Sequence, residues 1–189
     1  LGSSKPDLEF SSLVGQSVTV EIAQTSSAKR YINGIVRRLS LVQLTDEKSA
    51  EFRAIVVPTL WTLGLNGDCR IFQNKTAVDI IKQVLQDNKV TDIRDALSGS
   101  YRTRDYCVQY RESALAFVSR LMEEEGIFYF FEHKDGQHTL VLADDSSVHE
   151  NVPGTSTLSF VGHSSQRIYD DVIHDVGYEE QLITEGVAL

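Results

Sequence analysis

A helical pattern that occurs twice near the middle of the chain limits its fold more than any other feature of the sequence. In the first copy, Thr76 has the character of a helix N-cap, and Asp79 three residues later completes a pair of the capping-box type. The residues that follow have the spacing of one apolar helix face: Ala77, Ile80, Ile81, Val84 and Leu85. The pattern predicts an amphipathic helix that stops at Asn88.

The second copy has the same layout. Ser113 is the predicted N-cap and Gly126 the predicted C-cap. The apolar stripe between them consists of Ala114, Phe117, Val118, Leu121 and Met122. Two explanations remain open, a degenerate internal duplication or simply two helices packed on a sheet, and with one sequence the second is the simpler.

The first third of the chain has the pattern of β-structure. Residues 18–22 alternate between apolar and polar, which is the period of a half-buried strand. The other predicted strands are residues 31–41, where Gly34 indicates a bulge or sharp bend, and residues 51–57, which Pro58 ends. Short polar links predict an antiparallel meander, whose open edges lead us to expect partner strands upstream of Leu1 or in another chain.

The last third contains a clear β-hairpin. Residues 127–143 form two strand-like runs around the turn sequence Lys134-Asp135-Gly136-Gln137. Residues 144–165 are polar, include Pro153 and Gly154, and predict a loop or linker. Strand character returns at residues 170–178, where Val172, His174 and Val176 alternate with Ile173 and Asp175.

The charge balance argues against a nucleic-acid-binding protein. The formal net charge is −9, with a pI near 5.0, whereas nucleic-acid binders usually carry a basic patch. Residues 101–106 interleave aromatic and basic side chains, but this is a short and weak signal. No apolar run approaches the roughly 20 residues that span a bilayer. Residues 1–6 lack the apolar core of a signal peptide, and no Met begins the chain, so we expect a processed form or a fragment.

No catalytic, cofactor-binding or metal-binding residues are predicted. The sequence has neither a helical His pair nor a Cys-x-x-Cys motif, and it lacks the nucleophile-elbow, P-loop and dinucleotide-binding motifs. A Cys107–His133 pair is conceivable, but Cys107 lies in a strand-like stretch where a packed thiol is favoured. The five histidines are His133, His138, His149, His163 and His174, of which the first two flank the hairpin turn, where solvation is the default.

Two acidic groups have both a functional and a structural interpretation. Residues 123–125 are three glutamates at the end of the second helix, where negative charge opposes the helix dipole and could meet a basic partner. A solvated face is the favoured interpretation. Asp144 and Asp145 could form the carboxylate pair of a glycosidase, but adjacent acids more often cap a strand end. Cys69 and Cys107 are expected to be free thiols, with a bridge between them as the alternative.

Several segments resemble one known family. They are residues 60–61 (Leu-Trp), 68–75 (Asp-Cys-Arg-Ile-Phe-Gln-Asn-Lys), 106–113 (Tyr-Cys-Val-Gln-Tyr-Arg-Glu-Ser), 117–133 and 138–144. Together they resemble the amino-terminal hub region of valine-glycine repeat protein G, the trimeric spike of the bacterial type VI secretion system. The resemblance runs from about Pro6 to about Asp145 and, more weakly, over residues 170–189.

The resemblance implies an α+β fold related to the hub of a contractile-phage baseplate. Residues 1–66 would be a partial first hub β-barrel, and residues 67–145 an α/β insertion domain with two helices and a β-hairpin. Residues 146–169 would be a loop or linker, and residues 170–189 the start of a truncated second barrel. The first strands of the first barrel, most of the second barrel, the oligonucleotide-binding-type domain and the needle would all be absent.

The resemblance also implies a mechanical function without catalysis. Family members form homotrimers whose six barrels match a hexameric secretion tube, and they carry the tip protein and effectors through regions absent here. Neither nucleic-acid binding nor membrane insertion is implied. Assembly would occur in the bacterial cytoplasm before translocation into a target cell.

Three alternatives stay open at this point. They are the hub of a phage or phage-derived contractile particle, a cell-wall hydrolase carried on a spike, and a nucleic-acid module based on residues 101–106. The helix stripes and strand faces predict that six residues are mostly buried: Trp61, Phe117, Leu121, Ile127, Tyr129 and Leu140.

Overall fold

The computed structural model describes residues 2–4, 7–23, 29–46, 49–150, 157–161, 172–173 and 175–180. The chain divides into two compact units, Leu1–Val148 and His149–Leu189. Each unit is described by itself.

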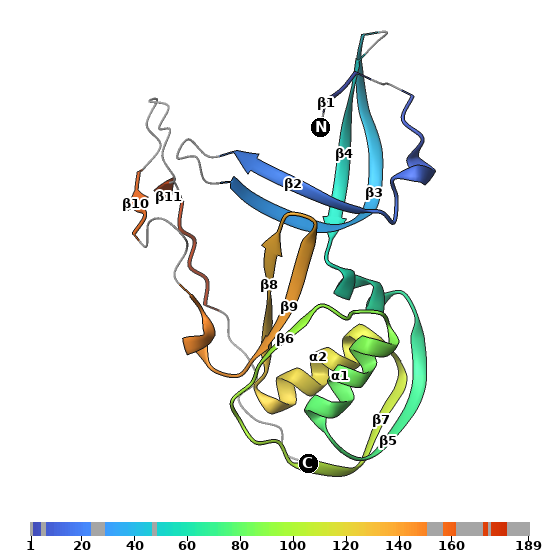
Figure 1. The fold of residues 1–189 in the computed structure, drawn as a ribbon, viewed down its shortest axis with the longest axis vertical. Helices are drawn as coiled ribbons and strands as arrows, with labels where there is room; N and C mark the ends of the chain where they lie inside the picture. The colour runs from blue at the N-terminus through green and yellow to red at the C-terminus, as the bar shows by residue number, and fades with distance from the viewer. Residues whose placement is uncertain are drawn as a thin grey trace. The chain divides into compact units, whose positions relative to one another are not determined.

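A four-stranded antiparallel sheet, here called the front sheet, begins the first unit (Figure 1). Its strands are β1 (Gly2–Ser3), β2 (Ser17–Ala23), β3 (Lys29–Asp46) and β4 (Ser49–Val57), in the order β1-β4-β3-β2. The long strand β3 pairs with β2 through residues 29–35 and with β4 through residues 35–46. It turns where its partner changes, so the sheet curls (Figure 1). The predicted meander is therefore present.

The bulge or sharp bend predicted at Gly34 lies one residue before Ile35, where β3 changes partner and turns. The first register shift in β3 falls between Val36 and Arg38, two residues after Gly34. Gly34 is buried and paired, and a Cβ atom at this position would lie 2.6 Å from the carbonyl oxygen of Val57. Glycine is needed here because the backbone of β4 approaches closely at its end.

An α/β module follows the front sheet. Its elements are η2 (Thr59–Gly64), β5 (Gly67–Thr76), α1 (Ala77–Asp87), β6 (Ile93–Ala96), β7 (Thr103–Ser113), α2 (Ala114–Glu125), β8 (Phe128–Lys134) and β9 (Gln137–Ala143). Strands β5 and β7 form an antiparallel ribbon, and β6-β9-β8 form a second sheet in which only the β6–β9 pair is parallel. The two helices pack together, with the ribbon along one side of them (Figure 1).

The caps of both helices are as predicted. The Thr76 hydroxyl accepts the Asp79 N–H at 3.1 Å, and the Asp79 carboxylate accepts the Thr76 N–H at 3.1 Å, which completes the capping box. The Ser113 hydroxyl accepts the Ala116 N–H at 3.1 Å. Gly126 ends α2 in the left-handed conformation, with φ 70°.

Four of the six predicted core residues are buried. Phe117, Leu121, Ile127 and Leu140 belong to the hydrophobic core of the α/β module. Trp61 is half-buried, with the Arg37 guanidinium 4.4 Å from its ring centroid.

The prediction for Tyr129 was wrong, because its side chain is 40% exposed. Strand β8 is at the edge of its sheet, so a residue there is covered on one side only. The Tyr129 ring packs edge-on against Phe131, at 5.9 Å between ring centroids, and its other flank faces solvent.

The backbone repeats its unusual conformations between the two helical segments. Asn74 (φ 53°) and Arg111 (φ 52°) are both left-handed two residues before a helix N-cap. Lys89 (φ 63°) and Gly126 (φ 70°) are both left-handed where a helix has ended. Within each pair the positions differ by 37. Such conformations are uncommon for residues other than glycine, so the coincidence is informative.

A side-chain contact is repeated with the same offset. Lys75 Nζ donates to Gln83 Oε1 at 2.5 Å, and Arg120 donates to Glu112 Oε1 at 2.7 Å at the equivalent positions. In both contacts, the residue directly before the helix N-cap (Lys75 or Glu112) binds the residue seven positions after the N-cap (Gln83 or Arg120). The donor is the residue before the cap in the first contact and the helix residue in the second. Two unrelated helices need not share these details, so the structure favours an internal duplication.

The second unit contains a short parallel strand pair, β10 (Ser159–Phe160) and β11 (Val172–Ile173). The sequence did not predict β10, which lies within the expected linker. Of the strand predicted at residues 170–178, the described residues 172–173 form β11, whereas residues 175–178 have no regular structure. Pro153, Gly154, His163 and His174 lie outside the described residues.

Candidate functional site

The Asp144–Asp145 pair does not have the properties of a glycosidase site. The Asp144 carboxylate accepts the N–H groups of Ser98 (2.9 Å) and Gly99 (2.7 Å) and the hydroxyl of Tyr101 (2.7 Å). These bonds hold the pKa of Asp144 far below its ordinary value, and bonds from Ser147 lower the pKa of Asp145. A glycosidase needs one carboxyl with a raised pKa, whereas Asp144 is used to anchor the loop before β7.

The structure does not bring Cys107 and His133 together as a catalytic pair. Cys107 is buried in β7 opposite Phe72, while the His133 ring contacts β3. Both cysteines are free. Cys69 pairs with Tyr110 on the exposed face of the ribbon, and Cys107, three residues from Tyr110, faces the opposite side. Among the described residues, no group of three or more His, Cys, Asp or Glu side chains could hold a metal ion.

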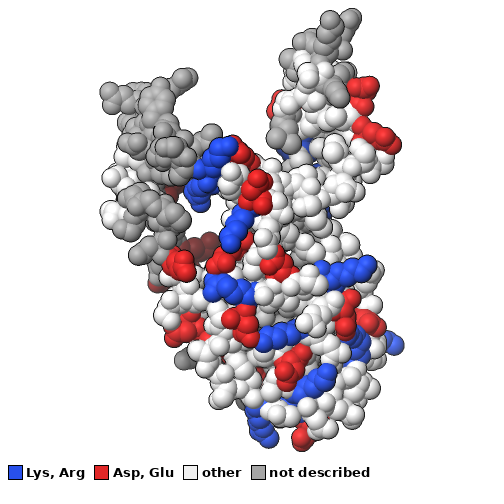
Figure 2. Space-filling view, viewed as in Figure 1, with Lys and Arg blue, Asp and Glu red and all other residues white. Residues whose placement is uncertain are grey.

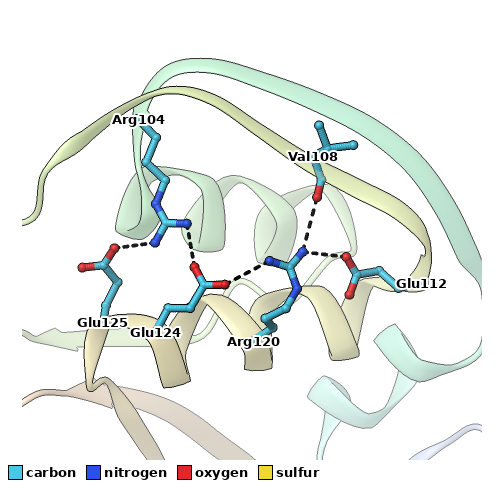
Figure 3. Close-up of polar contacts among 6 residues, drawn as sticks. All are labelled: Arg104, Val108, Glu112, Arg120, Glu124 and Glu125. Carbon is cyan, nitrogen blue, oxygen red and sulfur yellow. Dashed lines mark hydrogen bonds and ion pairs between the residues drawn. The ribbon is translucent and has the colours of Figure 1, made fainter. Parts of the chain in front are cut away.

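The acidic end of α2 binds Arg104, one of the two basic residues in the aromatic and basic stretch 101–106 (Figure 3). Arg104 donates to Glu124 at 2.7 Å and to Glu125 at 2.6 Å, and its side chain is only 25% exposed. Tyr101 of the same stretch is held by Asp144. The sequence suggested a basic ligand site and an acidic one, whereas in the folded chain Arg104 of the first group is paired with Glu124 and Glu125 of the second.

The same network continues along α2 through Arg120 (Figure 3). This side chain donates to Glu124 at 3.1 Å, to Glu112 at 2.7 Å and to the Val108 carbonyl at 3.3 Å. It thereby fastens the helix to β7. Figure 2 shows acidic and basic side chains interspersed over the visible face of the α/β module, without a large area of one sign.

Exposed apolar side chains collect on the outer face of the β5–β7 ribbon. Ile71, Tyr106 and Tyr110 are each more than half exposed. The register places Tyr106 opposite Gln73, Ile71 opposite Val108 and Tyr110 opposite Cys69. Large exposed patches of this kind commonly mark interaction surfaces.

The front sheet carries a second set of exposed apolar side chains. They are Val20, Ile22, Ile32, Leu41, Val42, Leu44 and Ile55. Arg38 and Arg53 border a groove of about 370 Å³ on the β3–β4 half of this sheet. No sequence pattern predicted the groove, because it depends on the register of β3 against β4.

A polar junction joins the front sheet to the β8–β9 hairpin. The Asn33 side chain donates to the Val18 carbonyl at 3.1 Å, and its Oδ1 lies 2.7 Å from His138 Nδ1. The Asn33 backbone N–H donates to His133 Nδ1 at 3.2 Å, and the Thr59 N–H donates to His138 Nε2 at 3.0 Å. Asn33 is only 4% exposed, and a polar side chain this deeply buried depends on its hydrogen bonds for its stability. The histidines expected to be solvated are instead the contact points of the hairpin.

The first unit is thus a curled antiparallel sheet joined to an α/β module, and both parts carry exposed apolar side chains. The profile described as "Phage tail baseplate hub (GPD)" matches residues 1–189, and the chain belongs to this family. The spike protein VgrG1c of the type VI secretion system of Pseudomonas aeruginosa is 41% identical over 175 residues, covering 90% of this chain and 24% of the relative. VgrG1a of the same organism is 37% identical over 175 residues, covering 90% of this chain and 27% of the relative.

Two further proteins extend the comparison. The "Actin cross-linking toxin VgrG1" of Vibrio cholerae is 33% identical over 190 residues, covering 100% of this chain and 17% of the toxin. The solved structure of the Escherichia coli c3393 protein, a type VI secretion component described as similar to the T4 tail proteins gp27 and gp5, aligns with a TM-score of 0.71. That alignment has 22% identity and covers 87% of this chain and 44% of the other, so it supports the fold alone.

The chain spans about a quarter of the length of its Pseudomonas relatives. Within the described residues, no helix is long and apolar enough to cross a membrane.

Proposed function

We propose that this chain is part of the hub of a type VI secretion spike, which self-associates as a homotrimer and caps a hexameric secretion tube. The observation that carries the proposal is the 37–41% identity to three spike proteins over about 90% of the chain. The tip protein and effectors would be carried by parts of a longer protein. Assembly would take place in the bacterial cytoplasm, followed by translocation into a target cell.

The proposed domain division follows the change in architecture along the chain. Residues 1–66 would belong to the first hub barrel, because the front sheet is curled but open. Residues 67–145 would be the insertion domain, since they supply most of the helix-centred core. Residues 146–169 would link this domain to the start of a second barrel at residues 170–189.

The front sheet is the proposed subunit contact. Its exposed aliphatic side chains would gain from burial, at roughly 25 cal/mol for each Å² of apolar surface. A trimer of this kind is cyclic, so its contacts are heterologous and close on themselves. Obligate interfaces bury upwards of about 2,000 Å² in total, which needs a face of several strands.

We further propose that this region contributes assembly and no catalysis. One relative is described as an actin cross-linking toxin, but this chain corresponds to only 17% of that protein. In this chain the acids and the thiol considered for catalysis are used as a loop anchor and as core packing. A hub from a phage or phage-derived particle has the same fold, but the spike relatives favour the secretion system.

The test is a measurement of mass and tube binding on a protein of the relatives' length that contains this chain. Light scattering coupled to size-exclusion chromatography should give the mass of three subunits. The trimer should then co-sediment with tubes assembled from the tube protein. A well-folded monomer that stays in the supernatant would contradict the proposal.

A further inference from the structure

The junction between the front sheet and the hairpin depends on two rings that accept hydrogen bonds. The rings of His133 and His138 lie opposite each other on β8 and β9, with 6.2 Å between their centroids. Each takes a backbone N–H from a different segment, Asn33 in β3 for His133 and Thr59 at the start of η2 for His138. A backbone N–H can only donate, so both accepting nitrogens must be unprotonated.

The network also locates the proton on the other side of the His138 ring. The Val18 carbonyl can only accept, so the Asn33 side chain must present its NH₂ group there and its Oδ1 to His138. Nδ1 of His138, 2.7 Å away, must therefore carry the proton. His138 is neutral with its hydrogen on Nδ1, and His133 is neutral with its hydrogen on Nε2.

The surroundings of His138 offer little compensation for a positive charge. On the sheet side the contacting residues, Asn33 and Thr59, are uncharged. Asp92 is the nearby acid, but its carboxylate already accepts bonds from Gln137 (2.5 Å) and Thr139 (2.9 Å).

One basic residue and one acidic residue line the crevice beside His138. Lys89 and Asp92 line the adjoining crevice of about 210 Å³, and the His133 ring is the neighbour of His138 across the β8–β9 pair. Burial and the His133 ring lower the pKa of His138, whereas Asp92 acts in the opposite direction. The hairpin turn carries one residue of each sign, Lys134 and Asp135.

We propose that the His133–His138 pair is an acid-sensitive latch between the β8–β9 hairpin and the segments β3 and η2. Each ring accepts its backbone N–H bond, from Asn33 or from Thr59, only while that ring is neutral. Protonation places an N–H on the ring nitrogen that accepted the backbone N–H, so two donors face each other and the backbone bond is lost. The Thr59 hydroxyl oxygen, 3.1 Å from His138 Nε2, can accept the new ring N–H, but the Thr59 backbone N–H then has no ring nitrogen to bind. Each ring controls one bond, while the bond from the Gly136 N–H to the Thr19 hydroxyl, at 3.0 Å, joins the hairpin to the front sheet without either ring. This device is independent of the proposed trimer, because every group belongs to one chain.

Nuclear magnetic resonance of the full chain tests the proton positions directly. At about pH 7.5, ring ¹⁵N shifts should show hydrogen on Nδ1 of His138 and on Nε2 of His133. Couplings through the hydrogen bonds should connect Thr59 N to His138 Nε2 and Asn33 N to His133 Nδ1. The opposite tautomer of His138 would overturn the assignment.

Hydrogen exchange tests the release. After correction for intrinsic rates, protection of the Asn33 and Thr59 amides should fall roughly tenfold or more between about pH 7.5 and about pH 5.5. The Val36 amide, which donates to the Gln16 carbonyl at 3.0 Å, is the internal control and should keep its protection. Ring titration without loss of protection at Asn33 and Thr59 would refute the latch.

Matched variants separate the latch from general acid instability. His138→Gln keeps an acceptor for Thr59 and a donor for Asn33 but does not titrate, so the Thr59 amide should stay protected at about pH 5.5. His149→Gln replaces an exposed histidine of the other compact unit and should leave the wild-type response unchanged. If Thr59 in His138→Gln loses protection as in the wild type, the latch is wrong. If that variant does not fold, the wild-type ring shifts and exchange still decide the question.

Discussion

The guanidinium group of Arg104 in β7 lies 2.6 Å from the Glu125 carboxylate at the end of α2, although the two residues are 21 positions apart. Three glutamates at a helix C-terminus are unfavourable, because the carbonyl end of the helix dipole is already negative. Arg104 offsets this repulsion and ties the end of α2 to the ribbon. The acidic run is thus part of the module's internal structure.

Replacing this arginine should destabilise the α/β module. We expect Arg104→Ala to lower the free energy of unfolding by about 1–2 kcal/mol, since it removes two partly buried ion pairs, leaving Glu125 without this partner and Glu124 with Arg120. Arg102→Ala, at an exposed position two residues away, should change it by less than about 0.5 kcal/mol. Urea titrations of both variants provide the measurement, and equal effects would mean that the network contributes nothing specific.

Truncation at the centre of the core should be far more costly. Phe117 is fully buried and stacks on Phe72, with 5.6 Å between ring centroids. Phe117→Ala should lower the free energy of unfolding by about 3–5 kcal/mol through lost burial and the cavity that remains. Leu65→Ala, at an exposed position, is the control and should stay within about 0.5 kcal/mol. A loss below about 1 kcal/mol for Phe117→Ala would show that Phe117 does not lie on the buried face of α2.

A methyl group at Gly34 tests the close approach of β3 and β4. Gly34→Ala should cost about 1–3 kcal/mol, because its Cβ would meet the Val57 carbonyl oxygen at 2.6 Å and backbone cannot give way easily. Gly64→Ala is matched in chemistry, but its Cβ would lie 3.5 Å from Leu115 in ordinary contact. Thermal unfolding should show a lower melting temperature for Gly34→Ala than for Gly64→Ala. If Gly34→Ala is as stable as the wild type, the backbone at Gly34 and the Val57 carbonyl lie further apart than described.

Local features of this fold could be predicted and long-range features could not. Thr76, Ser113 and Gly126 act within one turn of their own helices, so their roles are visible in a few neighbouring residues. The bond between Asn33 and His138 joins positions 105 residues apart, and no periodic pattern encodes it. From the sequence alone, His138 is therefore expected to be solvated, because the sequence does not show that Asn33 of the front sheet contacts it.

Edge positions and short strands were missed for a related reason. Tyr129 has the alternation of a core strand, but its exposure depends on β8 being at an edge. The four-residue β6 has too few residues to show a period, and it exists through its parallel pairing with β9.

Stability should fall with acid through His138. Its folded-state pKa is lowered by burial and by His133, so the folded chain binds this proton less readily than the unfolded chain does. The resulting contribution to stability is present above the unfolded pKa of about 6.5 and is lost as the pH falls through the lower folded value. Urea titrations between about pH 7.5 and about pH 5.5 should show this loss in the wild type and less of it in His138→Gln. An identical pH dependence in both proteins would assign the effect to other groups.

Assembly should depend on the exposed aliphatic side chains of the front sheet. In a protein of the relatives' length, Leu44→Glu and Val42→Glu should convert the trimer to monomers, because a carboxylate buried without a partner is strongly unfavourable. Leu65→Glu introduces the same charge at an exposed position outside the sheet and should leave the trimer intact. Ile71→Glu tests the outer face of the ribbon as the competing surface. Light scattering gives the mass, and circular dichroism checks that each variant is folded. If both front-sheet variants stay trimeric and Ile71→Glu is monomeric, the subunit contact is on the ribbon and not on the front sheet. If the wild-type protein is monomeric, the proposed trimer is wrong.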